Sequence, residues 1–196
     1  MIASSLVLSF LGPSGGGKGT QARRLVEKFG FAYIGSGDLL RQRAKKIDFT
    51  GRKVKECLKE GRLVSSLVMA DLWEEEMERV KNFSPFPGLI IDGSPRAPFE
   101  VRLIDSGLGW YDWMDQYRVV YFNVDYGESK KRVLAKEGRK RKDDTLAALN
   151  QKWTWFRKQT LPVIEDYRRR GLLIEIDGRP PIEDVYRALV KALKLE

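Results

Sequence analysis

A glycine-rich segment near the start of the chain has the composition of an anion-binding loop. It reads Gly12-Pro13-Ser14-Gly15-Gly16-Gly17-Lys18-Gly19-Thr20-Gln21 and lies between an apolar run and a helical pattern. Glycines let backbone N–H groups approach an anion without an intervening Cβ, and a helix that begins at the loop adds its own free N–H groups. Lys18 adds a positive point charge. The segment therefore predicts a phosphate-binding loop in which residues 15–20 contact the nucleotide.

Histidine is absent from the 196 residues, and the formal net charge is +9. Catalysis must then use carboxylates, lysines, arginines or backbone groups, because the commonest general base is missing. The excess positive charge predicts an anionic partner without deciding between nucleotide, nucleic acid and membrane surface.

Short apolar runs alternate along the chain with helical patterns. Strands are expected at 6–11, 31–34, 89–91, 119–124 and 172–176. Helices are expected at 18–29, 37–46, 52–60, 66–81, 98–106, 128–136, 143–158 and 182–194. Apolar runs without polar interruptions are typical of parallel strands buried on both faces. The alternation predicts an α/β fold, with a five-stranded parallel sheet flanked by helices and the ligand at the carboxyl ends of its strands.

The organisation within this single domain, residues 1–196, is also predicted from the pattern. Residues 36–68 read as helix throughout where one crossover helix would do, so we interpret them as a small inserted subdomain. The core then comprises 1–35, 69–136 and 143–196, with a short connecting loop at 137–142. Pro162 is expected to break or kink the segment that follows, and Gly171 to mark a helix end.

Five further motifs follow the glycine-rich loop. They are Ser36-Gly37-Asp38-Leu39-Leu40-Arg41, Gly61-Arg62-Leu63-Val64, Ile90-Ile91-Asp92-Gly93-Ser94-Pro95-Arg96, Arg141-Lys142-Asp143-Asp144 and Ile176-Asp177-Gly178. In this order they resemble the adenylate kinase family over essentially the whole chain. The loop agrees, because Gly19 separates Lys18 from Thr20, as in adenylate kinases and UMP/CMP kinases.

The resemblance implies a P-loop NTPase fold with a helical insertion that binds the nucleoside monophosphate (NMP) and a very short lid. It also implies the Mg²⁺-dependent, reversible reaction of ATP with AMP to give two ADP, and a role for each matching residue. Catalytic roles fall to Lys18, Arg96, Arg141, Lys152 and Asp92. ATP would contact residues 15–20 and Gly178, and its adenine would stack on Arg132. AMP would contact Ser36, Arg41, Val64, Gly93, Arg96 and Glu100. Mg²⁺ would be held by phosphates and water, with Asp92 and Thr20.

Three departures from the family pattern bear on these roles. The lid spans only residues 137–142, which leaves open whether Lys136, Arg139 or Arg141 contacts phosphate. Lys152 stands where the family usually has arginine, so a bidentate contact becomes a point charge. Glu100 replaces the glutamine that reads the AMP base. A carboxylate only accepts hydrogen bonds, which suits guanine better than adenine, so GMP, CMP or UMP remains the alternative to AMP.

A P-loop switch or nucleic-acid-associated NTPase is the alternative from another class. It is motivated by the net charge and by the aromatic residues Trp110, Tyr111, Trp113 and Tyr117. Such proteins usually keep Ser or Thr directly after the loop lysine, and we expect these aromatics to pack a loop against the sheet. No apolar run approaches the ~20 residues of a membrane span. A single cysteine, Cys57, cannot form an internal disulfide and fits a reducing compartment, so we expect a cytosolic protein. We also expect it to be a monomer that binds neither nucleic acid nor membrane.

Overall fold

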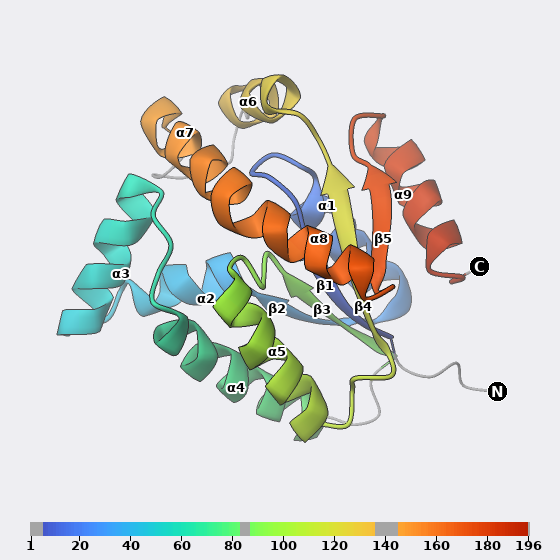
Figure 1. The fold of residues 1–196 in the computed structure, drawn as a ribbon, viewed down its shortest axis with the longest axis horizontal. Coiled ribbons are helices and arrows are strands. Elements are labelled where there is room, and N and C mark those ends of the chain that lie inside the picture. Colours follow the sequence, from blue (N-terminus) through green and yellow to red (C-terminus); the bar gives the residue numbers. More distant parts are fainter. Residues whose placement is uncertain (1–5, 83–86, 136–144, 196) are drawn as a thin grey trace.

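Five parallel strands form the central sheet of the protein (Figure 1). The computed structural model describes residues 6–82, 87–135 and 145–195. The strands are β1 (Leu6–Leu11), β2 (Ala32–Gly35), β3 (Gly88–Asp92), β4 (Tyr117–Asn123) and β5 (Leu173–Asp177). Their spatial order is β2-β3-β1-β4-β5, and every neighbouring pair is parallel. The prediction of a five-stranded parallel sheet is confirmed.

Both faces of the sheet are buried, as the unbroken apolar runs predicted. On β1, Val7 packs into one cluster, whereas Leu8 and Phe10 pack into the other. The first cluster lies beneath the helices α2, α4, α5 and α8, and the second beneath α1 and α9. The carboxyl ends of β1 and β3 lie side by side, since Phe10 pairs with Asp92. This edge therefore brings the glycine-rich loop next to the Asp92 motif.

The predicted helices are present with shifted ends, and one further helix, α8, was not predicted. They are α1 (Lys18–Phe29), α2 (Ser36–Arg43), α3 (Phe49–Glu60), α4 (Ser66–Asn82), α5 (Pro98–Trp110), α6 (Tyr126–Leu134), α7 (Leu146–Trp155), α8 (Leu161–Arg169) and α9 (Ile182–Ala192). Helix α3 lies at the left of Figure 1, far from β5, and its C-terminal end approaches α7. A Cβ at Gly61, the C-cap of α3, would lie 2.5 Å from the Ala148 carbonyl oxygen. Helices α2 and α3 thus occupy the segment that was predicted as an insertion.

The prediction that Pro162 would break the helix is wrong, because the helical segment continues through it. After α7 the chain forms a π-helical turn, η1 (Phe156–Thr160), and then α8, in which Pro162 lies within the first turn. The Leu161 N–H bonds to the Phe156 carbonyl at this junction, and a proline in the first turn of a helix costs little because its missing N–H is not needed there. Gly171 ends the segment as expected, with φ of 68° and the Leu172 N–H bonded to the Tyr167 carbonyl.

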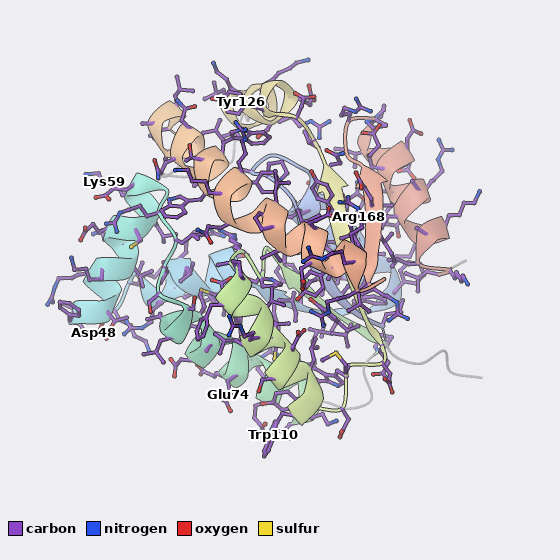
Figure 2. All side chains as sticks on the ribbon, in the orientation of Figure 1. Asp48, Lys59, Glu74, Trp110, Tyr126 and Arg168 are labelled. Atoms are coloured by element: carbon purple, nitrogen blue, oxygen red, sulfur yellow. The ribbon has the colours of Figure 1, made fainter. Side chains whose placement is uncertain are left out.

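The aromatic group behaves as predicted in part. Tyr111, Trp113 and Tyr117 are buried, which confirms packing for these three. Trp110 is 81% exposed at the end of α5 and points outward in Figure 2, so the prediction that it packs is wrong. No helix in the described ranges is long and apolar enough to cross a membrane. The lid loop at 137–142, and with it Lys136, Arg139, Arg141 and the aspartates at 143 and 144, lies outside the described residues.

Candidate active site

The glycine-rich loop connects β1 to α1, as predicted, and its glycines are required by close contacts. A Cβ on Gly12 would lie 2.7 Å from the Phe122 carbonyl oxygen, and one on Gly15 would lie 2.9 Å from that of Ser129. Gly17 caps α1 with φ of 90°, a conformation that other residues rarely adopt. The free N–H groups at the start of α1 therefore face the loop, which is the arrangement that binds phosphate.

Lys18 closes this loop. Its Nζ donates hydrogen bonds to the carbonyl oxygens of Gly12, at 2.8 Å, and Pro13, at 2.9 Å. The loop is also tied to α6, because Ser129 Oγ donates to the Ser14 carbonyl at 2.5 Å. The ammonium thus lies at the mouth of the loop, where an incoming phosphate would compete with the two carbonyls for it.

Asp92 ends β3 beside the loop, and its two carboxylate oxygens have different surroundings. Its Oδ2 accepts a 2.9 Å hydrogen bond from the Tyr33 hydroxyl. Its Oδ1 is buried and, among the described residues, has no hydrogen-bond donor. A Cβ at Gly19 would lie 3.3 Å from Oδ2, so the glycine after Lys18 allows the carboxylate to approach α1. Burial, and then the negative charge of Asp92, raise the pKa of Tyr33, which keeps the phenol protonated and donating.

These residues fit a magnesium ion that keeps most of its water. The buried Oδ1 of Asp92 accepts from no donor in the described part of the chain, and metal-bound water would supply one. Thr20, in the first turn of α1, adds a hydroxyl oxygen at the same pocket. The described part of the chain contains no group of three or more acidic, histidine or cysteine side chains that would cage a metal. This donor set suits an ion held chiefly by phosphates and water.

Arg96 is held in place from both its side chain and its backbone. Its Nε donates to the Gly93 carbonyl at 2.5 Å, and the Thr160 hydroxyl donates to the Arg96 carbonyl at 3.0 Å. Gly93 has φ of 81°, and a Cβ there would lie 2.8 Å from Arg96 Nη2. The glycine of the motif is therefore needed for the guanidinium to lie where it does.

Ser36 and Arg41 face the same region from α2. The Ser36 and Ser94 hydroxyls are hydrogen-bonded at 2.8 Å, and Trp73 Nε1 donates to Ser36 Oγ at 3.0 Å. Arg41 pairs through Nη2 with Asp38 Oδ1 at 2.5 Å, and its side chain remains 31% exposed. An anion that enters this region would therefore meet the Arg41 guanidinium, whose ion-pair partner, Asp38, lies on the same helix.

Glu100 lies in the first turn of α5 and binds the backbone before it. The residue is 4% exposed, and its Oε2 accepts a 2.6 Å hydrogen bond from the Arg96 N–H. Burial raises the pKa of Glu100 above its ordinary value, although hydrogen bonds from the N–H groups of Arg96 and Ala97 oppose the shift. A carboxylate at the third helical position that reaches back to a preceding N–H is a known capping arrangement. Glu100 therefore also fixes the backbone of Arg96.

Two pockets meet at these residues. The first, here the α2–α3 pocket, is lined by α2, the turn at 61–64, residues 93, 94, 96 and 100, and α7 with its π-helical turn. The second, here the loop pocket, is lined by residues 14–21, Asp92, Arg132 and the turn at 178–182. Among the described residues, the cations that line both pockets are Lys18, Arg41, Arg96 and Lys152. Val64 lines the first pocket, Gly178 the second, and Gly93 both.

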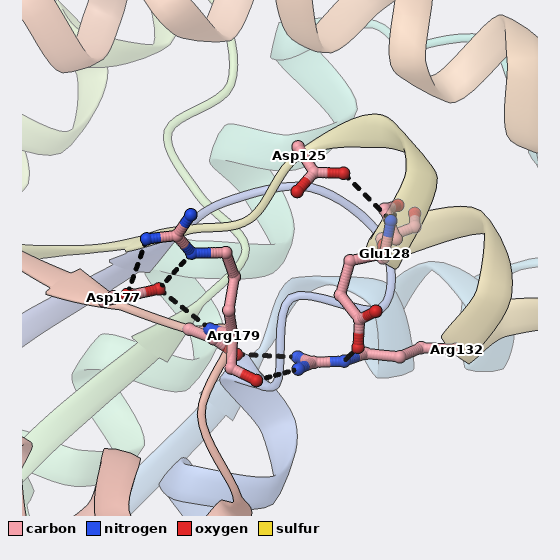
Figure 3. A network of polar contacts seen from close by, with 8 residues as sticks. Asp125, Glu128, Arg132, Asp177 and Arg179 are labelled. Carbon is pink, nitrogen blue, oxygen red and sulfur yellow. Dashed lines mark hydrogen bonds and ion pairs between the residues drawn. The ribbon is translucent and has the colours of Figure 1, made fainter.

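Arg132 joins α6 to the turn after β5 (Figure 3). It donates to the carbonyl oxygens of Gly178, at 2.7 Å, and Arg179, at 2.9 Å, and to Glu128 Oε1 at 2.6 Å. These bonds run through the edge of the guanidinium, so a base can still stack on its planar face. Arg179 in turn pairs with Asp177 and lowers the pKa of Asp177 to about 2, which keeps that carboxylate charged.

Several residues of the site were missed by the sequence analysis. Tyr33, Ser94, Trp155 and Thr160 all line one of the pockets or bind a predicted residue. The sequence carried no signal for Tyr33 or Thr160, whose partners are 59 and 64 residues away in the chain. Glu100 was predicted only as a contact to the acceptor, and its bond to the Arg96 N–H was missed. That second role did have a sequence signal, since a glutamate in the first turn of a helix often caps it.

Comparison with known proteins gives this site its family. The family model described as adenylate kinase matches residues 10–172. The chain belongs to the adenylate kinase family. It is 35% identical over 191 residues to the adenylate kinase of Methylobacterium nodulans, covering 94% of each chain. It is also 35% identical over 188 residues to the adenylate kinase of Hyphomonas neptunium, covering 95% of this chain and 97% of the relative.

The relatives of this chain also include kinases that are named for other acceptors. The chain is 30% identical over 187 residues to UMP-CMP kinase 1 of rice, Oryza sativa subsp. japonica, covering 95% of this chain and 73% of the relative. Members of the adenylate kinase family are phosphotransferases that act on nucleoside monophosphates, so this chain is a nucleotide-binding phosphotransferase.

Proposed function

We propose that the protein is an adenylate kinase, which transfers a phosphoryl group reversibly from Mg-ATP to AMP and so yields two ADP. The observation that carries this proposal is the position of Lys18, Arg41, Arg96 and Lys152, which line both pockets. A cluster of cations at the junction of two pockets is what a reaction between two polyanions requires. A hydrolysing switch would have no use for the second pocket.

The loop pocket is assigned to ATP. Its phosphates would lie on residues 15–20, with the N–H groups at the start of α1 and the Lys18 ammonium directed at them. Its adenine would lie against the Arg132 guanidinium, beside Gly178. Asp92 and Thr20 would hold the water shell of Mg²⁺, and the ion would supply charge neutralisation at the phosphates.

The α2–α3 pocket is assigned to the acceptor. Arg41 and Arg96 would bind its phosphate, while Ser36, Val64, Gly93 and Glu100 would surround its nucleoside. Arginine forks suit such a clamp because they bind phosphate through two N–H groups at once. Lys152 supplies a third positive charge from α7, where a point charge replaces a fork.

The chemistry then needs no general base. An oxygen of the AMP phosphate, already anionic, attacks the γ-phosphorus of ATP, and the bond to the β–γ bridging oxygen breaks as ADP leaves. The four junction cations lower the repulsion between the two anions and hold them in line. Arg141 would add to this set from the lid. We further propose the division into a core, an acceptor-binding insertion at 36–68 and a lid at 137–142, in a cytosolic monomer.

Another acceptor base is the second candidate, and two observations favour it. Glu100 only accepts hydrogen bonds when ionised, and the relatives include UMP-CMP kinases. AMP stays our first choice because the backbone turn at 62–64 lines the same pocket, where one of its N–H groups could supply the donor that Glu100 lacks.

The test is to incubate the protein with Mg-ATP and, separately, AMP, GMP, CMP or UMP, and to follow the diphosphates by chromatography. We expect ADP from ATP and AMP at the highest kcat/KM, and little phosphate release from ATP alone. Diphosphate formation only with CMP and UMP would replace AMP as the acceptor. Phosphate release without any diphosphate would overturn the kinase assignment.

A further inference from the structure

Trp155 lines the α2–α3 pocket and carries a buried hydrogen-bond donor, its indole N–H. It is the last residue of α7, and its side chain is half-buried in the pocket wall. Its Nε1 is buried and, among the described residues, has no hydrogen-bond partner. The indole N–H can only donate, so its missing partner must be an acceptor atom. Buried donors are nearly always paired in native proteins, and an unpaired one at a pocket indicates a ligand or an ordered water.

The backbone at this position is also unusual. The π-helical turn η1 (Phe156–Thr160) begins directly after Trp155, and such turns occur frequently at functional sites. Trp155, Phe156 and Thr160 all line the same pocket. The Thr160 hydroxyl bonds to the Arg96 carbonyl, so this wall of the pocket is fixed to the residue proposed to bind the acceptor phosphate.

The two pockets place Trp155 along the acceptor molecule. Lys152, one helical turn before it, lines both pockets and so lies near the phosphates. Trp155 lines the α2–α3 pocket but not the loop pocket, and Glu100 does the same. Trp155 therefore lies away from the phosphate junction, toward the nucleoside end.

We propose that Trp155 is a binding residue for the acceptor nucleoside monophosphate, and that its indole N–H donates to an oxygen or nitrogen acceptor of the ribose or the base. This inference rests on the assignment of the α2–α3 pocket to the acceptor. It adds a donor to a region where the Glu100 carboxylate only accepts. The pair then contributes both polarities to recognition of the nucleoside.

The matched experiment compares Trp155→Phe with Trp153→Phe. Phenylalanine keeps an aromatic ring at position 155 and removes the donor. Trp153 packs against the rings of Tyr126, at 5.2 Å, and Phe156, at 5.4 Å, and is not part of either pocket lining. The readouts are AMP and ATP dissociation constants by calorimetry and KM values for both nucleotides.

We expect Trp155→Phe to weaken AMP binding by about three- to tenfold, the usual size of one lost neutral hydrogen bond, with ATP binding unchanged. Trp153→Phe should bind both nucleotides like the wild type. Repeating the measurement with 2′-deoxy-AMP separates two sources of the acceptor atom. A loss seen with AMP but not with 2′-deoxy-AMP assigns the N–H to the ribose, and an equal loss with both assigns it elsewhere on the nucleoside.

A second measurement uses only the wild-type protein. In ¹H–¹⁵N spectra of the wild type, the indole N–H signal of Trp155 should move downfield on addition of AMP and stay in place on addition of ATP. Unchanged AMP binding in Trp155→Phe, or an unmoved indole signal in a wild-type protein that makes ADP from ATP and AMP, overturns the inference. A wild type that makes no ADP instead contradicts the proposed function, so the two failures are distinguishable.

Discussion

The Tyr33 hydroxyl, on β2, donates a 2.9 Å hydrogen bond to Oδ2 of Asp92, on β3. The bond occupies one carboxylate oxygen and leaves the other, Oδ1, buried and without a partner among the described residues. The two strands are neighbours in the sheet, and the phenol holds Oδ2 and thereby the orientation of the Asp92 carboxylate. Tyr33 is thus a positioning residue for the carboxylate that we assign to the magnesium shell.

Tyr33→Phe should therefore raise the Mg²⁺ concentration needed for half-maximal activity by several-fold. An Asp92 carboxylate that is free to rotate holds metal-bound water less well. Removing a hydrogen-bond partner that orients a metal-site group typically lowers metal affinity or activity by about 10-fold or more. ATP binding measured without Mg²⁺ should not change. The readouts are a Mg²⁺ titration of the initial rate and calorimetry with and without the metal.

Tyr121→Phe is the control for this prediction. Tyr121, on β4, also donates to a strand-end residue, Asn123, at 3.2 Å, but it lines neither pocket. It should show an unchanged Mg²⁺ requirement. If Tyr33→Phe and Tyr121→Phe behave alike, the Tyr33 bond serves only the packing of β2.

Lys18→Ala and Arg96→Ala should each reduce kcat by about 10²- to 10³-fold, since each removes a preorganised charge at the transferring phosphoryl group, worth about 3–4 kcal/mol. The midpoint of urea unfolding should move little, because both side chains bond to loop carbonyls and neither belongs to the hydrophobic core. Arg102→Ala, an exposed cation on α5 above the Phe99 ring, is the control and should keep full activity. A nearly normal rate in the Arg96 variant would remove it from the phosphate clamp.

The parts of this site that could be predicted from sequence are those whose chemistry is local. Gly12, Gly15 and Gly93 are glycines because a carbonyl or a guanidinium lies within 3 Å of where their Cβ would be, and such requirements leave a pattern in the sequence. The buried strands were predictable for a similar reason, since burial on both faces demands unbroken apolar runs.

The remaining features depend on residues that meet only in the folded chain. Tyr33 reads as one more aromatic residue of a strand until β3 brings Asp92 beside it. Pro162 reads as a helix breaker, yet packing of Val163, Ile164 and Tyr167 into the core carries the helix through it. Trp110 was predicted to pack like its aromatic neighbours, but the chain turns after α5 and leaves it in solvent.

Glu100 should make the stability of the protein depend on pH. Its pKa in the folded protein is raised, chiefly by burial, so its contribution to stability is fully present below the unfolded pKa and is lost as pH rises through the folded pKa. Glu100→Gln removes this ionisation while its amide oxygen can still accept from the Arg96 N–H. We expect the variant to gain unfolding free energy relative to the wild type as pH rises from about 4 to 8. Urea unfolding across this range measures the difference, and parallel curves would contradict it.

The same variant tests how the acceptor base is chosen. An ionised Glu100 can accept from the exocyclic amine of adenine, but the ring nitrogen beside that amine needs a donor. A glutamine supplies both, and an unpaired buried acceptor costs about 1–3 kcal/mol. Glu100→Gln should therefore raise kcat/KM for AMP relative to GMP, by up to about tenfold if no backbone N–H of the turn at 62–64 already serves the ring nitrogen.

The hydrogen bond from the Arg96 N–H limits how Glu100 can contact a base. One oxygen of Glu100 already accepts from the Arg96 N–H, so only the remainder of the carboxylate can face a base. Glu100→Ala separates the two roles, because it removes the cap as well as the acceptor. If Glu100 only positions Arg96, Glu100→Ala should lower kcat for all four monophosphates alike, and Glu100→Gln should leave their kcat/KM ratios unchanged. A shift of the AMP to GMP ratio in Glu100→Gln, with kcat retained, requires that the side chain contacts the base.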